Sequence, residues 1–284
     1  MLKYKIEMVM VKALINTLGL FPLSWRFKYG EFLGILIYYA IKKRREITYK
    51  NLKIAFPEKS MSELKKIAKE SYKSTAKNVL IPFYMEELIE KNWIEYENKE
   101  LIDKLLQKDR GLIILTMHMA GFEAGFSIGK DYKTNVVFKK QKNPYLNDMM
   151  TKCREKTGAK TILKNLENGS NDKIIEVFKN KEILVLASDQ YSEDVEIKFF
   201  GRDTWANTGV ILLGMKYKCP ILFAYSTYGK NKIKLHFVDE LEIEKVGSLK
   251  ESLKYNTQNL FSRYEEIIKK YPEQYMWQHN RWRK

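Results

Sequence analysis

The sequence from Leu112 to Gly125 reads Leu-Ile-Ile-Leu-Thr-Met-His-Met-Ala-Gly-Phe-Glu-Ala-Gly. Its first part, 112–117, is a short apolar run of the kind found in strands buried on both faces of a parallel sheet. His118 follows this run, and the chain has only three histidines. Open α/β sheets bind their ligands in the crevice outside the carboxyl ends of the strands. The stretch therefore predicts a buried strand that ends at a functional site.

The sequence beyond Trp93 alternates between short strand-like runs and stretches of helical periodicity. The predicted strands are 112–117, 135–139, 183–188, 195–200, 220–226 and 232–238. The predicted helices are 98–108, 121–129, 144–157, 171–180, 206–217 and 250–270. This alternation predicts an α/β fold with a mixed, mostly parallel central sheet flanked by helices.

The first 90 residues have a different pattern, which is helical throughout. Apolar residues recur at helical spacing from Ile6 to Leu20, and a second apolar segment covers 32–41. A short helix over 46–58 follows, and Ser60 with Glu63 forms a capping box that opens a helix reaching about Leu80. We therefore expect a helical, membrane-associating region over 1–90 and an α/β domain over 91–284.

The two apolar segments are shorter than the ~18 to 20 uninterrupted apolar residues of a typical membrane span. With the basic run 42–45 behind them, they suit a helical hairpin that lies in the membrane interface on anionic lipid. Two alternatives stay open: core helices of a soluble domain, or a tilted span by the first helix. The start of the chain lacks a convincing signal-peptide cleavage site, so we expect it to be retained.

The formal net charge of +16 predicts an acidic partner, which is nucleic acid, anionic lipid or an acidic protein. Charge alone does not choose among these, and a general preference for lysine gives the same excess. The two cysteines, Cys153 and Cys219, lie far apart in the sequence and match neither a disulfide framework nor a zinc motif. A reducing compartment is expected.

His118 lies five residues before Glu123, a spacing that would put the two side chains about 140° apart on a continuous helix. If His118 instead lies in a turn and Gly121 bends the chain into the next helix, Glu123 can reach back to the imidazole. A carboxylate bonded to one ring nitrogen leaves the other free to take a proton from a hydroxyl. We interpret the pair as a His-Glu dyad that acts as general base.

Several further segments occur in the order and spacing of one known family. The sequence resembles the late acyltransferases of lipid A biosynthesis, which belong with the lysophospholipid acyltransferases that share an H-x4-D/E motif. The resemblance covers nearly the whole chain. It is carried by Gly30-x3-Gly34, the segment 51–58 (Asn-Leu-Lys-Ile-Ala-Phe-Pro-Glu), His118-x4-Glu123, Lys142-Asn-Pro-Tyr-Leu146, Arg154, Gly158, Asp189-Gln190, Phe199-Phe-Gly201, Thr208-Gly209 and the tail from Tyr271 to Trp282.

This resemblance implies transfer of a fatty acyl chain from acyl carrier protein to a hydroxyl of a lipid A precursor, without cofactor or metal, at the cytoplasmic face of the bacterial inner membrane. It implies that Arg154 lies near the site, against substrate phosphate or the developing oxyanion. Asp189 and Gln190 are expected to bind acceptor hydroxyls or to fix their turn. Lys139 and Lys140 stand where relatives commonly have Arg-Pro, and they are candidates for contact with an anionic group.

Other functions remain as alternatives. The acceptor could be a lysophospholipid or another glycolipid, or the protein could bind anionic membranes without catalysis. No nucleic-acid motif is visible, and a metal-dependent hydrolase would need a third ligand beside His118 and Glu123. His236 has the position of a strand-face residue. In the tail, Trp277, His279 and Arg281 either dock on the core or lie against lipid.

Overall fold

A seven-stranded sheet forms the centre of the computed structural model, which describes residues 1–164 and 170–283. The strand order is β1-β9-β8-β2-β5-β3-β4, and all neighbouring pairs are parallel except β8 and β9. The strands are β1 (Ile94–Glu97), β2 (Leu112–Thr116), β3 (Thr134–Lys139), β4 (Lys160–Lys164), β5 (Ile183–Ala187), β8 (Ile221–Tyr228) and β9 (Ile233–Glu240). The predicted fold class, a mostly parallel sheet with flanking helices, is confirmed.

Two strands form a separate antiparallel hairpin, β6 (Tyr191–Phe199) and β7 (Arg202–Ala206). The predicted strand 195–200 is therefore part of this hairpin and not of the central sheet, and the helix predicted over 206–217 begins at Gly209, after β7. Strands β1 and β4 are not among the predicted strands. These are short strands at the two edges of the sheet, where the apolar signal of a doubly buried strand is weaker.

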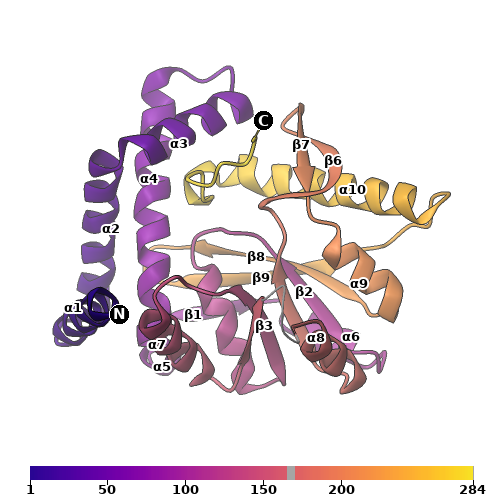
Figure 1. Cartoon of the computed structure of the whole chain (residues 1–284), viewed down its shortest axis with the longest axis horizontal. Coiled ribbons are helices and arrows are strands. Elements are labelled where there is room, and N and C mark those ends of the chain that lie inside the picture. Colours follow the sequence, from indigo (N-terminus) through magenta and orange to yellow (C-terminus); the bar gives the residue numbers. More distant parts are fainter. Residues whose placement is uncertain (165–169, 284) are drawn as a thin grey trace.

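Helices surround the sheet, and α2 and α4 lie side by side at one end of it (Figure 1). The N-terminal helices are α1 (Leu2–Gly19), α2 (Leu23–Ala40), α3 (Lys42–Ala55), α4 (Met61–Leu80), the 3-10 turn η1 (Ile81–Tyr84) and α5 (Met85–Glu90). The remaining helices are α6 (Glu100–Leu106), η2 (Phe122–Lys130), α7 (Pro144–Glu155), α8 (Ser170–Lys179), α9 (Gly209–Tyr217), α10 (Leu249–Lys270) and η3 (Pro272–Gln274). None of the helices in the described parts of the chain is long and apolar enough to cross a bilayer.

The β2 strand lies in the middle of the sheet because its side chains are apolar on both faces. All four residues from Leu112 to Leu115 are buried. Ile113 and Leu115 contribute to one hydrophobic core, and Leu112 and Ile114 contribute to a second core on the opposite face. Each such burial stabilises the fold by about 1.5–3 kcal/mol. Both cores also contain side chains from the first 90 residues, so the helical region packs directly on the sheet.

The contact between α2 and α4 depends on a close approach at Gly34. A Cβ atom at this position would lie 2.5 Å from the carbonyl oxygen of Tyr72 and 2.8 Å from the Cα atom of Lys73. These are backbone atoms, which cannot move aside as a flexible side chain does. The small residues of the Gly30-x3-Gly34 segment therefore set the distance between the two helices.

We predict that Gly34→Ala lowers the free energy of unfolding by about 1–3 kcal/mol, because the added methyl group overpacks the helix contact. Gly19→Ala is the matched control, since a Cβ there meets nothing within 4 Å. Denaturant unfolding of both variants measures the difference. Equal stability of the two variants would contradict this account of the contact.

Candidate active site

The register of two parallel strands brings His118 and Asp189 together. Thr116 at the end of β2 is paired with Ala187 at the end of β5. Each functional side chain comes two residues later, so the two leave the sheet at the same level of its carboxyl edge. The Nδ1 atom of His118 lies 2.7 Å from Oδ1 of Asp189, which also accepts a hydrogen bond of 3.2 Å from the His118 backbone N–H.

The Asp189 carboxylate is buried and fully engaged. Its side chain is 2% exposed, and its Oδ2 atom accepts a hydrogen bond of 3.0 Å from the Tyr275 hydroxyl. Burial by itself raises the pKa of Asp189, but the charge and hydrogen bond of His118, together with backbone N–H donors, hold the pKa below its ordinary value. Burial likewise lowers the pKa of His118, and Asp189, with a smaller contribution from Glu123, brings the net pKa above its ordinary value.

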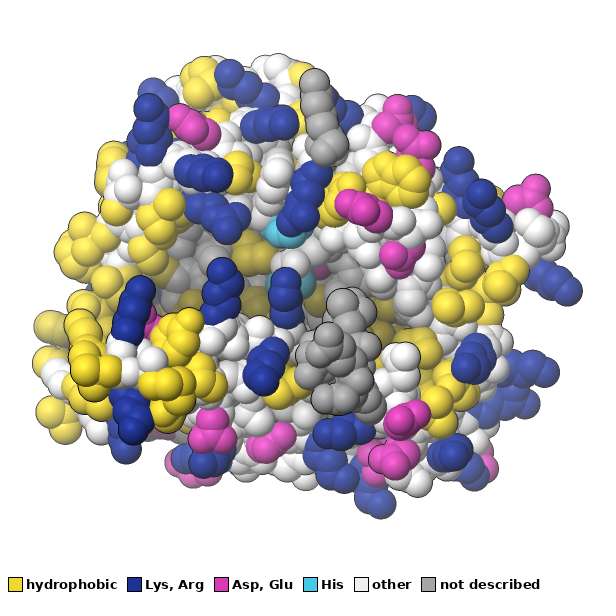
Figure 2. All heavy atoms as spheres, viewed as in Figure 1, with side chains coloured by type: hydrophobic (Ala, Val, Ile, Leu, Met, Phe, Trp, Pro, Cys, Tyr) yellow, Lys and Arg dark blue, Asp and Glu magenta, His cyan; other side chains and the backbone are white. Residues whose placement is uncertain are grey.

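The second nitrogen of the ring is the one available for chemistry. When Nδ1 donates to Asp189, Nε2 carries the lone pair, and the Gln190 amide nitrogen lies 3.3 Å from it. The His118 side chain is 21% exposed. Figure 2 shows a hollow in this face of the molecule, with histidine side chains at its bottom, apolar side chains within it and Lys and Arg around the rim. The ring is thus partly exposed, in contrast to its acid partner.

Glu123 has a different partner from the one the sequence predicts. Its two carboxylate oxygens accept hydrogen bonds from Nε (3.0 Å) and Nη2 (2.5 Å) of Arg154, and both side chains are at most 7% exposed. The guanidinium also stacks on Phe138, 3.9 Å from the ring centroid. This corrects the predicted His118–Glu123 dyad: Glu123 neutralises a buried arginine, and Asp189 holds the histidine.

The turn that carries His118 is clamped by α4 and by the C-terminal tail. Gly121 has a φ of +81°, and a side chain there would meet Ile233, so glycine is required. Asn78 on α4 accepts from the Gly121 N–H at 2.6 Å and donates to the Met119 carbonyl at 3.0 Å. On the other side the tail pairs with the turn like a strand, through a bridge between Met119 and Tyr275.

The rest of the tail docks on the core, which answers the alternative left open by the sequence. Trp277 and Arg281 are buried, and the Arg281 Nη1 atom donates to the Trp205 carbonyl at 2.7 Å. The Nε2 atom of His279 accepts a hydrogen bond of 3.3 Å from the Tyr191 backbone N–H. Burial lowers the pKa of His279 to about 4, so this ring is neutral at physiological pH.

An apolar cavity of about 330 Å³ lies between α2, α4 and the tail. Its apolar lining comes from Ile37, Tyr72, Ala76, Val79 and Met276, with Arg44 and His279 among the polar residues. His279 binds the backbone of Tyr191, which follows Gln190, and Gln190 meets the His118 ring. Met276, which lines the cavity, donates its backbone N–H to the His118 carbonyl at 3.1 Å, so the cavity adjoins the turn that carries His118.

Among the described residues, the other predicted side chains make no hydrogen bond or ion pair with this cluster. Lys139 and Lys140 are exposed at the end of β3. His236 is a strand residue on β9 and faces Glu97 and Thr227, as its pattern predicts. Within residues 1–164 and 170–283, no group of three or more His, Cys, Asp and Glu side chains is placed to hold a metal ion.

Asn78 and Tyr275 are the residues that the sequence analysis did not find. Asn78 is the last of three buried polar residues, after Ser71 and Ser74, on the inward face of α4. Small polar residues repeated on the buried face of an amphipathic helix are a usable signal, because buried polar groups need hydrogen-bond partners. Tyr275 lies in an aromatic tail whose sequence carries no such periodic signal.

The fold and the site define an α/β protein with a histidine–carboxylate pair at the carboxyl edge of a mostly parallel sheet. The chain belongs to the bacterial lipid A biosynthesis acyltransferase family, whose family model matches residues 1–284. It is similar to the lipid A biosynthesis palmitoleoyltransferase of Escherichia coli (strain K12), with 22% identity over 165 residues, which are 57% of this chain and 53% of the relative. A lipid A biosynthesis acyltransferase of Shigella flexneri matches with the same values. The matched segment spans about half the length of these relatives.

We predict that Glu123→Gln destabilises the protein by about 3–5 kcal/mol, because it leaves the buried Arg154 charge unpaired. The double variant Glu123→Leu with Arg154→Met should recover most of this loss, since it removes both charges together. Urea unfolding of the two variants provides the measurement. A double variant as unstable as the single one would show that the ion pair is not the reason for the loss.

We predict that Asp189→Asn lowers the pKa of His118, because burial then acts without the opposing carboxylate. The folded-state pKa of Asp189 is depressed, so the stability from this pairing is present above the ordinary aspartate pKa and lost as pH falls through the folded value. NMR titration of the three histidine rings, assigned with His236→Asn and His279→Asn variants, measures the shift. An unchanged His118 pKa would rule out the Asp189 pairing.

Proposed function

We propose that the protein transfers a fatty acyl chain from acyl carrier protein to a hydroxyl group of a lipid A precursor, with His118 as general base. The observation that carries this proposal is the His118–Asp189 pair, and the apolar cavity that adjoins the turn carrying His118 supports it. Membership of the lipid A acyltransferase family supports the same reaction class.

In the proposed reaction, Nε2 of His118 takes the proton of the acceptor hydroxyl as its oxygen attacks the thioester carbonyl carbon. Asp189 stabilises the resulting imidazolium. The tetrahedral intermediate then collapses, the carbon–sulfur bond breaks, and the imidazolium returns its proton to the leaving thiolate. Before substrate binds, the Gln190 amide occupies the position next to Nε2, so the acceptor hydroxyl must displace it.

Glu123 has a positioning role in this scheme. Its carboxylate is occupied by Arg154, and it acts on His118 through space by raising the ring's pKa. The ion pair fixes the first turn of η2, which follows the His118 turn. The cavity lined by Ile37, Ala76 and Val79 is a suitable site for the acyl chain, because its apolar walls would bury the methylene groups.

The proposed partners are acidic, which fits the net charge of +16. Of the 22 large apolar side chains exposed in the described chain, 14 lie within the first 41 residues. These side chains, on α1, α2 and the turn between them, form an N-terminal apolar surface of the kind that binds membranes. The basic run 42–45 follows directly. We propose association with the cytoplasmic face of the inner membrane through this surface.

The main alternative acceptor is a lysophospholipid or another glycolipid, since a general base activates any hydroxyl that reaches it. In the test, the purified protein is incubated with fatty-acyl acyl carrier protein and with each acceptor in turn. The lipids are then analysed by mass spectrometry. Acylation of lysophospholipid alone would overturn the lipid A assignment.

We predict that His118→Asn lowers the rate of acyl transfer by about 10²- to 10⁴-fold, the usual contribution of a general base. His236→Asn is the matched control, because His236 lies outside the site on β9. In the wild-type protein, kcat/KM should fall on acidification with an apparent pKa above 6.5, since only the neutral ring accepts a proton. A His118→Asn variant as active as the control would exclude the proposed base.

A further inference from the structure

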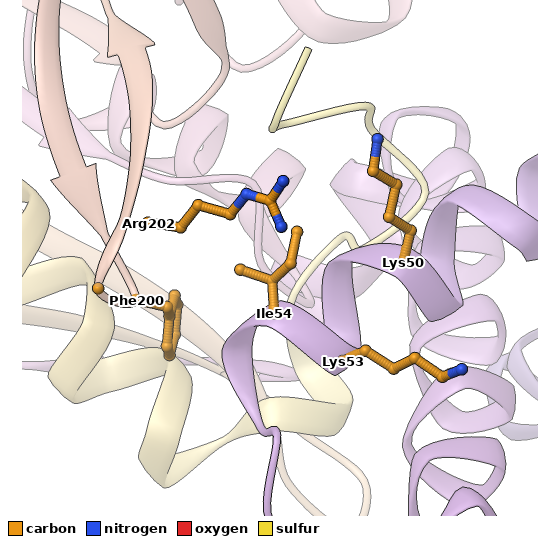
Figure 3. Close-up of a pocket in the computed structure, with 6 residues that line it drawn as sticks. Lys50, Lys53, Ile54, Phe200 and Arg202 are labelled. Carbon is orange, nitrogen blue, oxygen red and sulfur yellow. The ribbon is translucent and has the colours of Figure 1, made fainter. Parts of the chain in front are cut away.

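A second cavity lies where the β6–β7 turn meets α3. Its volume is about 430 Å³, and it is lined by Lys50, Lys53, Ile54, Phe200, Gly201 and Arg202. Figure 3 shows that Arg202 extends from the turn toward α3, where Lys50 and Ile54 lie, whereas Lys53 points outward. The apolar cavity beside His279 is lined by Arg44, at the start of the same helix, so α3 contributes to both cavities.

The positive charge of this second cavity is not compensated by the protein. Within the part of the chain that the structure describes, Lys50, Lys53 and Arg202 have no salt-bridge partner. The acids next to these cations in the sequence are paired with other lysines: Glu46 lies 3.8 Å from Lys42, Glu58 lies 3.9 Å from Lys59, and Asp203 binds Lys198. Glu265 accepts from the Phe200 N–H and binds Lys269. Lys50 and Arg202 carry like charges beside the same hollow, and an anion placed there would reduce the repulsion between them.

The turn that presents Arg202 is held in an uncommon conformation. Phe200 has a φ of +51° and Gly201 has a φ of +71°, the pair of left-handed residues that a two-residue hairpin turn of type I′ requires. Asn-Gly is the usual sequence at these positions, and phenylalanine is not. The Phe200 ring packs against Phe56 and Trp277, with ring centroids 5.8 Å and 6.2 Å away. This packing fixes the turn and makes the ring an apolar wall of the cavity.

We propose that this cavity binds the phosphate monoester of a phosphorylated lipid acceptor, with the sugar that carries it against Phe200 and Ile54. The guanidinium of Arg202 matches the geometry of phosphate oxygens, and Lys50 adds a point charge. The volume leaves room for a sugar ring beside the phosphate. The inference deepens the proposed function and rests on it for the identity of the acceptor. It adds a binding site at α3 that is separate from the apolar cavity.

The first experiment measures binding without catalysis. Glucosamine 6-phosphate and unphosphorylated glucosamine are titrated by calorimetry into the wild-type protein and into a cavity variant. The cavity variant combines Lys50→Gln with Arg202→Gln. The control variant is Lys230→Gln with Lys254→Gln, which removes two exposed cations elsewhere. The sugar phosphate should bind on the order of tenfold more weakly to the cavity variant, given the usual strength of hydrogen bonds to charged groups. Equal binding to the wild-type protein and both variants, equal losses in both variants, or no binding to any, would overturn the proposal.

The second experiment separates the acceptor from the bilayer as the source of the phosphate. KM is measured for a phosphorylated lipid A precursor and for its dephosphorylated form, and flotation is measured on phosphatidylcholine vesicles with and without phosphatidate. The proposal is supported if the cavity variant has a higher KM than the wild-type protein for the phosphorylated acceptor alone, with kcat unchanged. If the cavity variant instead binds phosphatidate vesicles more weakly than the wild-type protein and its KM is unchanged, the proposal that the cavity binds the acceptor is wrong. The cavity would then bind a membrane headgroup. Because the sugar-phosphate titration needs no turnover, failure of the acyl-transfer proposal would remain distinguishable from failure of this one.

Discussion

The parallel pairing of β2 with β5 is the constraint on which the site depends. Both strands are buried apolar runs, and their register pairs Thr116 with Ala187. Two residues further along each chain, His118 and Asp189 emerge opposite each other. A register shift of one residue would turn the side chains of one strand to the wrong face and separate the pair. The apolar packing on both faces of the sheet therefore fixes the distance between an acid and a base that are themselves polar.

The two buried ion pairs explain why the acid partner of His118 is Asp189. Arg154 reaches the interior from α7 and stacks on Phe138, where its charge needs a carboxylate. Glu123 is in the first turn of η2 and supplies one in a geometry with two hydrogen bonds. If Glu123 turned to the histidine instead, Arg154 would be left buried and unpaired. The two residues of the H-x4-E motif thus belong to two different ion pairs, His118 with Asp189 and Glu123 with Arg154. The charge of Glu123 still raises the pKa of His118.

Much of this arrangement could be predicted from the sequence, and the limits have physical causes. The run 112–117 and the run 183–188 are visible as buried strands, so the positions of His118 and Asp189 at the carboxyl edge follow from the pattern alone. The strand order does not follow, because apolar runs do not state which strand lies beside which. The sequence therefore indicates only a nearby partner for His118, Glu123, whereas the sheet brings the partner from 71 residues away. The hairpin of β6 and β7 was missed for a related reason, since Phe200 occupies a turn position that usually carries Asn.

The site links the N-terminal helices to the sheet. Asn78 holds the Gly121 turn, and it lies on α4, the helix against which α2 packs at Gly34. The tail completes the clamp: the Ser71 hydroxyl on α4 donates to the carbonyl of Tyr275, and the Tyr275 hydroxyl donates to Asp189. Helix α2, which carries part of the exposed N-terminal apolar surface, is thus connected to the imidazole through its packing on α4 and a few buried hydrogen bonds. Because these contacts join segments far apart in the sequence, the geometry of the proposed site can form only when the helical region, the sheet and the tail have all assembled.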